Sequence, residues 1–404
     1  MWNGELTSAL ETVLRDTVIT DDSPGTLLHD FQTMLDFVRE TEPTLTQSQL
    51  LKLQSLRPLN TALKRSIDHG LTRPLQKSFP NINGLYLLLR VSGLTVVQIR
   101  EKEATLILNE PVVEIWNNLN ADERYVALLE NWLFRGDEAV LGERGGLLGY
   151  NRPFWLWAEF VRDMLMGRRR GDDWITFTRY RPKHHNLALM ELFGLVRITD
   201  GPTVHKQAWQ IEDVQITAWG QAVAALLIGT VLEDDRIWNR LDSDDEWVSD
   251  LLYETLIPYR PKLQQQLVLP AQSFQPGSYV FKVSLSPSLW RRITIDAEAT
   301  LETFSDAILR AYQFDHDHLY LFRYPSPYGR PIQAFHPYMQ EQISVDEVRI
   351  GDLGLQAGSQ LLYNYDFGDD WRFDVLLERI DAADPTLKGY RLGEKRGRSP
   401  QQYR

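Results

Sequence analysis

The spacing of apolar residues changes from a helical to a strand-like period near residue 278. Before that point apolar residues recur about every three to four positions, which predicts a mainly helical region. After it, Tyr279, Phe281, Val283 and Leu285 alternate with polar residues, and a second strand is expected beyond a turn at Pro287. The pattern therefore predicts a mostly α N-terminal region and a strand-rich C-terminal part.

The strand-rich part contains one amphipathic helix. Thr300 suits its N-cap, and five apolar side chains share one stripe: Leu301, Phe304, Ile308, Leu309 and Tyr312. A strand at residues 318–324 and a hairpin at residues 361–378 follow. The economical architecture is a compact α+β module, a sheet with one packed helix.

Two segments of the helical region, residues 83–119 and 186–227, share one order of elements. Each has an apolar helix ending in Gly-Leu, a strand, a polar turn, a second strand and an amphipathic helix. Gly93 and Gly194 suit a helix C-cap at positive φ. Two strands directly after a helix resemble the wing of a winged-helix domain, so we expect two winged-helix-like units.

The expected organisation has four parts. Residues 1–135 are a helical region with the first winged-helix-like unit, and residues 136–257 hold the second. Residues 258–278 form a linker in which Pro and Gln accumulate, and residues 279–404 form the α+β module.

Composition indicates a soluble globular protein. The 404 residues include no Cys, which excludes disulfides and thiolate metal sites and favours a cytoplasmic setting. Charges occupy the place of a signal-peptide core, and the apolar runs are too short for a bilayer, so no membrane partner is expected. The net charge is −12, of which −9 lies on the first 276 residues, and this argues against wholesale coating of nucleic acid.

One basic segment is a candidate for contact with nucleic acid. Winged helices often place the helix before the wing in a DNA groove, and the second such helix follows a cluster of cationic residues. The candidate phosphate contacts are Arg168, Arg169, Arg170, Arg179, Arg181, Lys183 and Lys206, with His184, His185 and His205 beside them. The alternative is that the arginine run forms a solvated loop and that the units serve protein interaction.

The triplet Asp366-Phe367-Gly368 is not the metal-binding element of a protein kinase, because no Gly-rich loop, strand lysine or His-Arg-Asp loop precedes it. It fits a hairpin. With a three-residue loop of Gly368, Asp369 and Asp370, Phe367 faces Trp371 and Asp366 faces Arg372. This register predicts one continuous apolar face and an Asp366–Arg372 ion pair.

The segments "SLWRRITI", "DHDHLYLF" and "VRIGDLGLQAGSQLLYNYDFGDDWRFDVLLE" resemble successive signatures of the plasmid pRiA4b third-ORF-like family, also described as transposon-passenger proteins. The resemblance spans residues 279–404 and implies a compact α+β module without an established activity. The signature positions are Trp290, Arg291, Arg292, His318, Tyr365, Asp366, Phe367, Gly368, Asp369 and Trp371. The end, "GEKRGRSPQQY", departs from the acidic segment that is common in the family.

Two features of this module leave chemical alternatives open. His316 and His318 with Asp366, Asp369 and Asp370 contain metal-ligand types, but a His-x-His pair is weak evidence, so we expect no metal and no cofactor. Arg291 and Arg292 either pair with Asp366 or Asp374 inside the module or bind an external acidic or nucleic-acid partner.

The sequence therefore predicts a non-enzymatic binding or adaptor protein of prokaryotic type. Its setting would be a mobile-element, defence or regulatory system, with a protein partner and DNA as a second candidate ligand. The alternative is a hydrolase or nuclease with an acidic site on the C-terminal module, formed by Asp366, Asp369, Asp370 and His318. No catalytic residue is assigned, and the sequence does not give the oligomeric state.

Overall fold

The computed structural model describes residues 5–100, 103–136, 138–142, 153–167, 175, 178–233, 249–270, 273–326, 332–339 and 343–402. The chain divides into two compact units, which are described separately. Unit 1 comprises Met1–Val97 and Glu103–Leu269, and unit 2 comprises Gln98–Lys102 and Pro270–Arg404. The division at residue 269 falls inside the range expected for the linker. No helix among the described residues is both long enough and apolar enough to cross a bilayer.

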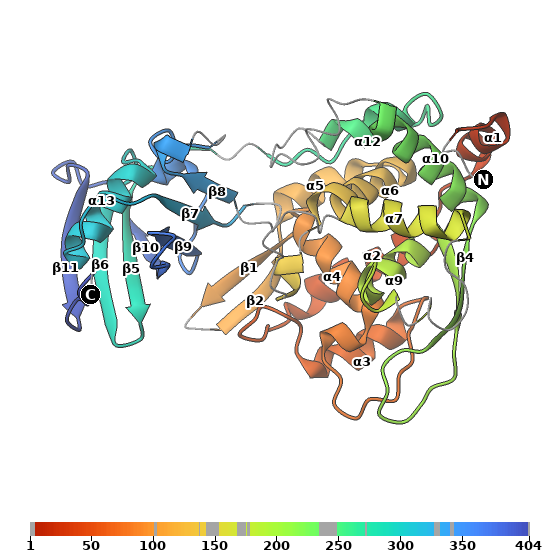
Figure 1. Ribbon diagram of the computed structural model, residues 1–404, viewed down its shortest axis with the longest axis horizontal. Helices are drawn as coiled ribbons and strands as arrows, with labels where there is room; N and C mark the ends of the chain where they lie inside the picture. Colours follow the sequence, from red (N-terminus) through yellow and green to blue (C-terminus); the bar gives the residue numbers. More distant parts are fainter. Residues whose placement is uncertain are drawn as a thin grey trace. The chain divides into compact units, whose positions relative to one another are not determined.

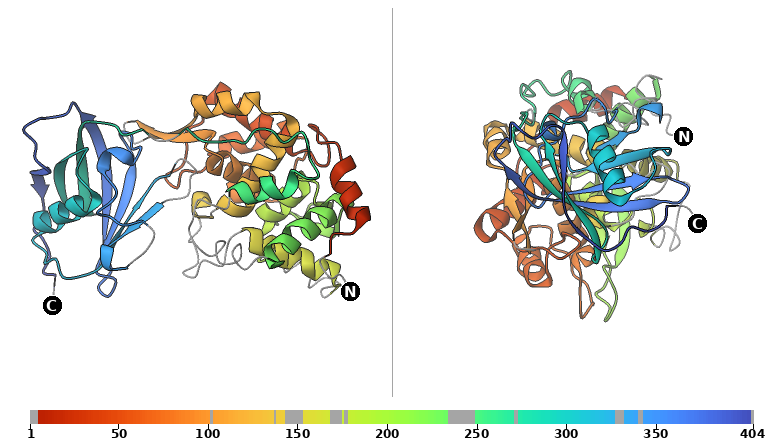
Figure 2. Two further views of the ribbon diagram at one scale, coloured as in Figure 1. Left: turned by 90° about the horizontal axis from the view of Figure 1, so that it is seen from above. Right: turned by 90° about the vertical axis from the view of Figure 1, so that its left-hand side faces the viewer.

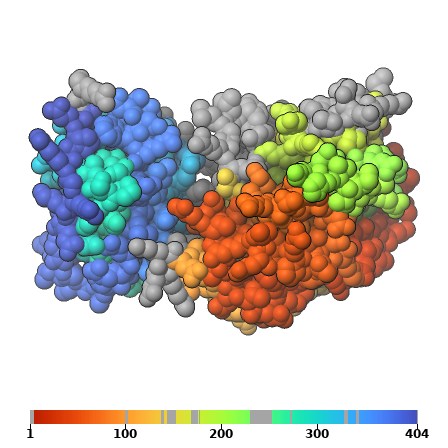
Figure 3. Space-filling model, turned by 90° about the horizontal axis from the view of Figure 1, so that it is seen from below, coloured from red at the N-terminus to blue at the C-terminus, as the bar shows by residue number. Residues whose placement is uncertain are grey.

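Unit 1 is mainly helical, as the apolar pattern predicted (Figure 1). Its α-helices are α1 (Ser8–Asp16), α2 (Leu27–Thr41), α3 (Leu53–Ala62), α4 (Pro80–Val91), α5 (Glu110–Asn118), α6 (Ala121–Glu130), α7 (Pro153–Leu165), α9 (His184–Leu192), α10 (Ala218–Glu233) and α12 (Ser249–Leu256). The shorter turns are η1 (Gln76–Ser78), η2 (Asn131–Arg135) and η3 (Glu138–Leu141). The N-terminal segment, red to orange, forms much of one face of this unit (Figure 3).

Among the described residues, two antiparallel strand pairs follow helices α4 and α9 in the chain. They are β1 (Thr95–Arg100) with β2 (Glu103–Leu108) and β3 (Val196–Asp200) with β4 (Ile211–Ile216). The order α4-β1-β2-α5 thus recurs as α9-β3-β4-α10, as the internal repeat predicted. Gly93 and Gly194 have φ of +73° and +71°, so the expected C-cap conformation at both glycines is confirmed.

Helices α4 and α9, the two equivalent helices of the repeat, pack against each other. Apart from Arg90, every residue of α4 is buried, and on α9 only His184 and Glu191 are half-buried. Gly84 permits the close approach, because a Cβ there would lie 2.6 Å from Cγ of Leu189. Since α9 is covered on its whole circumference, it has no free face with which to enter a DNA groove.

In the part of unit 2 that the structure describes, a seven-stranded antiparallel sheet carries one α-helix, α13 (Leu301–Tyr312), across one face (Figures 1 and 2). The strands are β5 (Ser278–Ser286), β6 (Leu289–Asp296), β7 (Tyr320–Tyr324), β8 (Ile332–Phe335), β9 (Gln360–Tyr365), β10 (Trp371–Asp381) and β11 (Tyr390–Arg396). Two short turns, η5 (Pro337–Met339) and η6 (Ile350–Asp352), connect them. The order across the sheet is β11-β6-β5-β10-β9-β7-β8.

The core of unit 2 lies between the sheet and α13. The Thr300 hydroxyl accepts a hydrogen bond from the Thr303 amide at 3.2 Å, which confirms the N-cap. The predicted stripe of α13 is buried, and it meets the alternating apolar residues of the strands, including Phe281, Tyr363 and Phe373. This part of the chain has the strand and helix content that its pattern predicted.

The β9–β10 hairpin has a register two residues away from the predicted one. Trp371 pairs with Tyr365, and Phe373 pairs with Tyr363, so the connection is the five-residue loop Asp366–Asp370. Phe367 leaves the aromatic ladder and is 43% exposed. A shift of two residues keeps every side chain on its own face, so the apolar face was predicted correctly while the pairing was wrong.

We predict that Gly84→Ala destabilises unit 1 although alanine is the better helix former. The added Cβ would crowd Leu189, and we expect a loss of about 1–3 kcal/mol in the free energy of unfolding. Thr61→Ala on the exposed surface of α3 is the matched control, with an expected change within about 0.5 kcal/mol. Urea unfolding of both variants measures the difference, and equal stabilities would contradict the packing argument.

Candidate functional site

Arg291 is a buried cation within the core of unit 2. It lies on β6, on the same face as Ile293 and Ile295, and is only 5% exposed. Its guanidinium donates to the backbone carbonyl oxygens of Ala311 and Arg396, both at 2.9 Å, and it stacks on the Tyr312 ring at 4.6 Å from the centroid. The cation is therefore held by carbonyl dipoles and an aromatic face.

The hydrogen bonds of Arg291 join three separate parts of the module. Ala311 belongs to the last turn of α13, where exposed carbonyl groups favour a positive charge. Arg396 ends β11, and the hydroxyl of Ser399 accepts a further hydrogen bond at 2.8 Å. Burial raises the pKa of Tyr312 to about 12, although the neighbouring Arg291 opposes the shift. Arg291 thus fastens α13 and the C-terminal segment to β6.

Trp290 and Arg292 occupy the opposite face of β6. Arg292 donates to both carboxylate oxygens of Glu378, at 2.6 and 3.1 Å, and also pairs with Glu394. The Arg292 guanidinium and the Lys282 ammonium lie 5.4 and 5.2 Å from the centre of the Trp290 ring. The hydrogen bond to Glu378 is the largest of the effects that raise the pKa of Arg292. Neither Arg291 nor Arg292 pairs with Asp366 or Asp374, so the expected internal partners of these arginines were wrong.

The Asp366 side chain closes the hairpin loop by accepting hydrogen bonds from backbone amides of the loop. Its φ is +55°, and its Oδ1 accepts from the amides of Gly368 at 3.0 Å and Asp369 at 3.4 Å. Asp tolerates this left-handed conformation better than most residues because its short side chain bonds locally. The predicted ion pair of Asp366 with Arg372 was wrong, because Arg372 instead pairs with Asp370 at 2.7 Å.

His318 lies beside this loop. Its Nε2 is 3.5 Å from Oδ2 of Asp366 and 3.5 Å from Oδ1 of Asp317, and its ring meets the edge of Tyr365. The Asp366 amide also donates to the backbone carbonyl of Leu319 at 3.0 Å. The sequence "DHDHLY" and the hairpin loop therefore meet at one corner of the module.

Tyr365 and Trp371 complete this corner. The Tyr365 hydroxyl donates to the Asp315 carbonyl at 2.6 Å, and the side chain of Gln402 accepts from the Asp315 amide at 2.5 Å. Trp371 meets the edge of Phe314 with the ring centres 4.9 Å apart. Gln402 was not predicted, because it lies in the terminal segment that departs from the family pattern and no motif marks it.

The histidine and aspartate side chains that were considered as metal ligands do not meet at one point. Nδ1 of His316 lies 3.6 Å from Asp306, whereas His318 faces Asp366. Across the part of the chain that the structure describes, no three His, Cys, Asp or Glu side chains are grouped so as to hold a metal ion.

The basic candidates of unit 1 that the structure describes lie on loops before and after α9. Arg168, Arg169 and Arg170 are outside the described residues. Arg179 and Arg181 are exposed, and Arg181 pairs with Glu159 at 2.9 Å. Lys183 precedes α9 with a φ of +75°, and the Lys206 amide donates to the carbonyl of Gly70 at 2.8 Å. Burial, with a smaller effect of Arg179, lowers the pKa of His184 to about 4.

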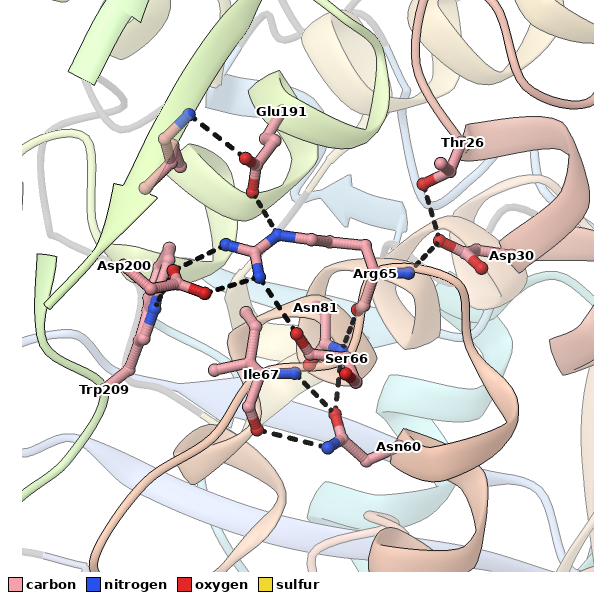
Figure 4. A network of polar contacts seen from close by, with 11 residues as sticks. Thr26, Asp30, Asn60, Arg65, Ser66, Ile67, Asn81, Glu191, Asp200 and Trp209 are labelled. Carbon is pink, nitrogen blue, oxygen red and sulfur yellow. Dashed lines mark hydrogen bonds and ion pairs between the residues drawn. The ribbon is translucent and has the colours of Figure 1, made fainter. Parts of the chain in front are cut away.

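Sequence reasoning missed a second polar centre, in which Arg65 lies between two carboxylates (Figure 4). Its guanidinium contacts Glu191 at 2.5 Å and both oxygens of Asp200 at 2.7 and 2.8 Å. Trp209 donates to Asp200 at 2.8 Å, and Asp30 accepts from the Arg65 amide at 3.2 Å. These residues come from distant parts of the sequence, and no motif connects them.

The two carboxylates of this centre share one guanidinium, and their pKa values shift in opposite directions. Burial raises the pKa of Glu191, against the effect of Arg65. Burial also acts to raise the pKa of Asp200, but hydrogen bonds from Arg65 and Trp209 outweigh it and lower that pKa. The network holds the segment that contains Arg65 against α9 and β3, which is a structural role.

Comparison with known proteins locates a family in unit 2. The sequence model described as plasmid pRiA4b ORF-3-like protein matches residues 278–401. The C-terminal module matches the plasmid pRiA4b ORF-3-like family. The chain is also similar to a solved structure titled protein of unknown function MM3350 from Methanosarcina mazei Go1. That match has 22% identity and a TM-score of 0.29 and covers 32% of this chain and 74% of the other. No curated protein matches the chain.

The two adjacent arginines of the pRiA4b-like module make a matched pair for substitution. We predict that Arg291→Ala lowers the free energy of unfolding by about 2–4 kcal/mol, because it removes a buried side chain that packs on Tyr312 and the donor of two part-buried carbonyl groups. Arg292→Ala removes partly exposed ion pairs with Glu378 and Glu394, with an expected cost below about 1 kcal/mol. Denaturant unfolding of both variants checks the order, and a reversed order would contradict the structural role of Arg291.

Two substitutions of Asp366 separate the stability that comes from closing the turn from the stability that comes from its negative charge. We predict that Asp366→Asn costs less than about 1 kcal/mol, because asparagine keeps the turn and the left-handed backbone. Asp366→Ala loses both and is expected to cost about 1–3 kcal/mol. Thermal unfolding compares them, and equal destabilisation by the two variants would show that the charge beside His318 matters more than the turn.

Proposed function

We propose that this protein is a non-enzymatic binding or adaptor protein. The proposal rests on the contacts of the family-signature side chains, which bind other parts of the module itself. Arg291 fastens α13 and the C-terminal segment, Asp366 closes a turn, and Tyr365 is hydrogen-bonded to Asp315. Side chains engaged in this way build a rigid platform, and a platform of this kind is suited to presenting a surface to a partner.

The repeated order of helix, two strands and helix supports the proposal that unit 1 is built from winged-helix-like units. The burial of α4 and α9 against each other favours a role of these units in architecture or protein interaction. Any DNA contact would then fall to exposed loop residues such as Arg179, Arg181 and Lys206. Arg181 is already paired with Glu159, which reduces the charge available to phosphate.

One observation favours a second candidate, a hydrolase or nuclease with an acidic site on the C-terminal module. His318 lies between Asp366 and Asp317, and a histidine beside carboxylates is a common acid–base arrangement. Two facts count against it. Asp366 is occupied by the turn, and Asp370 pairs with Arg372. A hydrolytic activity abolished by Asp366→Asn in a stable protein would support this candidate and overturn the first.

A protein partner is the expected ligand, and capture from the native host tests this. The tagged full-length protein should retain the same protein partner before and after nuclease treatment. Partners that disappear with nuclease, or a catalytic product formed without any partner, would overturn the adaptor proposal.

The DNA alternative has its own test in a gel-shift titration over a range of salt concentrations. Because α9 is buried and the chain is acidic, we expect no salt-sensitive binding that depends on Arg179, Arg181 and Lys183. Tight low-salt binding that is lost in the triple alanine variant would contradict this expectation and assign DNA as a ligand.

A further inference from the structure

Strand β11 ends the seven-stranded sheet with one edge unpaired. It pairs with β6 on one side, and across the described residues no strand pairs with its other side. Figure 1 shows β11 as the outermost strand on this side of the sheet, and its dark-blue residues lie at the surface in Figure 3. From Arg391 to Arg396 every residue is exposed, including Leu392 at 46%.

The backbone direction at this edge follows from one hydrogen bond. The carbonyl of Gly389 accepts from the amide of Asp296 and therefore points toward β6. Backbone groups alternate along a strand, and here the alternation runs up to a bulge that follows Leu392. Tyr390 and Leu392 therefore direct their N–H and C=O groups away from β6. An open edge of this kind is a template for one more strand.

The side chains around this edge are strongly basic. Residues 388–398 contain five Lys or Arg and one acidic residue, Glu394, in a chain of net charge −12. Glu394 is already paired with Arg292, and Arg391 is paired with Asp384 at 3.3 Å, whereas Lys395 and Arg398 extend the positive surface. This is the segment "GEKRGR" that departs from the family pattern.

Helix α13 gives the edge a fixed border. The Tyr390 hydroxyl donates to Asp306 at 2.8 Å. Gly389 lies close to Thr303, as a Cβ built on Gly389 would be 3.8 Å from Cγ2 of Thr303. Arg291 holds the Arg396 carbonyl at the far end of β11. The strand is thus held at both ends. Because β11 is already ordered, binding a partner segment costs less conformational entropy.

We infer that β11 binds an extended acidic segment of a partner protein, which adds to the sheet as an eighth strand. The inference rests on the proposed binding function and names its partner class. A second copy of β11 would bring like charges together, which disfavours self-pairing. A nucleic acid could use the positive charge but not the strand-edge hydrogen bonds, so the combination selects a peptide.

Fluorescence anisotropy of the full-length protein tests the inference with a defined probe. The probe is a fluorescein-labelled peptide of alternating glutamate and valine, matched to the 7 residues of β11. Leu392→Pro removes an outward N–H without removing a bond to β6, and we expect it to weaken binding about tenfold. Leu392→Ala keeps the N–H and should bind within about twofold of the wild type.

The contribution of charge is tested by Lys395→Glu, which should also weaken the peptide about tenfold or more. Lys77→Glu, the same charge change at an exposed position of η1 in unit 1, is the control and should leave binding unchanged. A lysine–valine peptide should not bind. The native melting temperature of each variant is measured first, and Lys395→Glu serves as the test if Leu392→Pro is unstable.

Three outcomes would overturn the inference. The first is that the acidic peptide does not bind. The second is that Leu392→Pro, Leu392→Ala and Lys395→Glu all bind the peptide equally well, and the third is that single-stranded DNA binds more tightly at the same residues. Host capture with Leu392→Pro separates this inference from the proposed function. A native partner retained by the variant would refute the edge as its site while leaving the adaptor function intact.

Discussion

The fold of the C-terminal module depends on one buried cation, Arg291. A guanidinium in a core requires compensation for its lost hydration, and here it finds hydrogen-bond acceptors in separate segments and the face of Tyr312. The same hydrogen bonds also fix the segments that supply these acceptors. The end of α13, the end of β11 and the segment at Ser399 are therefore positioned by the same side chain, and so is the strand edge that we assign to a partner.

Unit 1 follows a different constraint, the close packing of two equivalent helices. Gly84 allows α4 to approach α9, and the pair fills the interior of the unit. A helix that serves as a recognition element needs one exposed face, and neither helix keeps one. The repeat visible in the sequence is thus better explained by internal packing than by two DNA-reading units, and the acidity of the chain agrees with that explanation.

Much of this structure follows from local patterns in the sequence. Alternation identified β5, the cap at Thr300 identified α13, and Gly93 and Gly194 marked two helix ends. The hairpin register could not be chosen correctly, because a shift of two residues sorts the same side chains to the same faces. The Arg65 network and the contact of Gln402 with Asp315 could not be predicted from the sequence. They join residues that are distant in sequence, and no periodic pattern or motif marks them.

Hydrogen–deuterium exchange of the full-length protein tests the central claim most directly, that Arg291 fastens three segments together. In Arg291→Ala the account predicts faster exchange in β11, in the last turn of α13 and in residues 396–402, with Arg292→Ala close to the wild type. Faster exchange confined to the immediate neighbours of residue 291, or equal behaviour of the two variants, would contradict it.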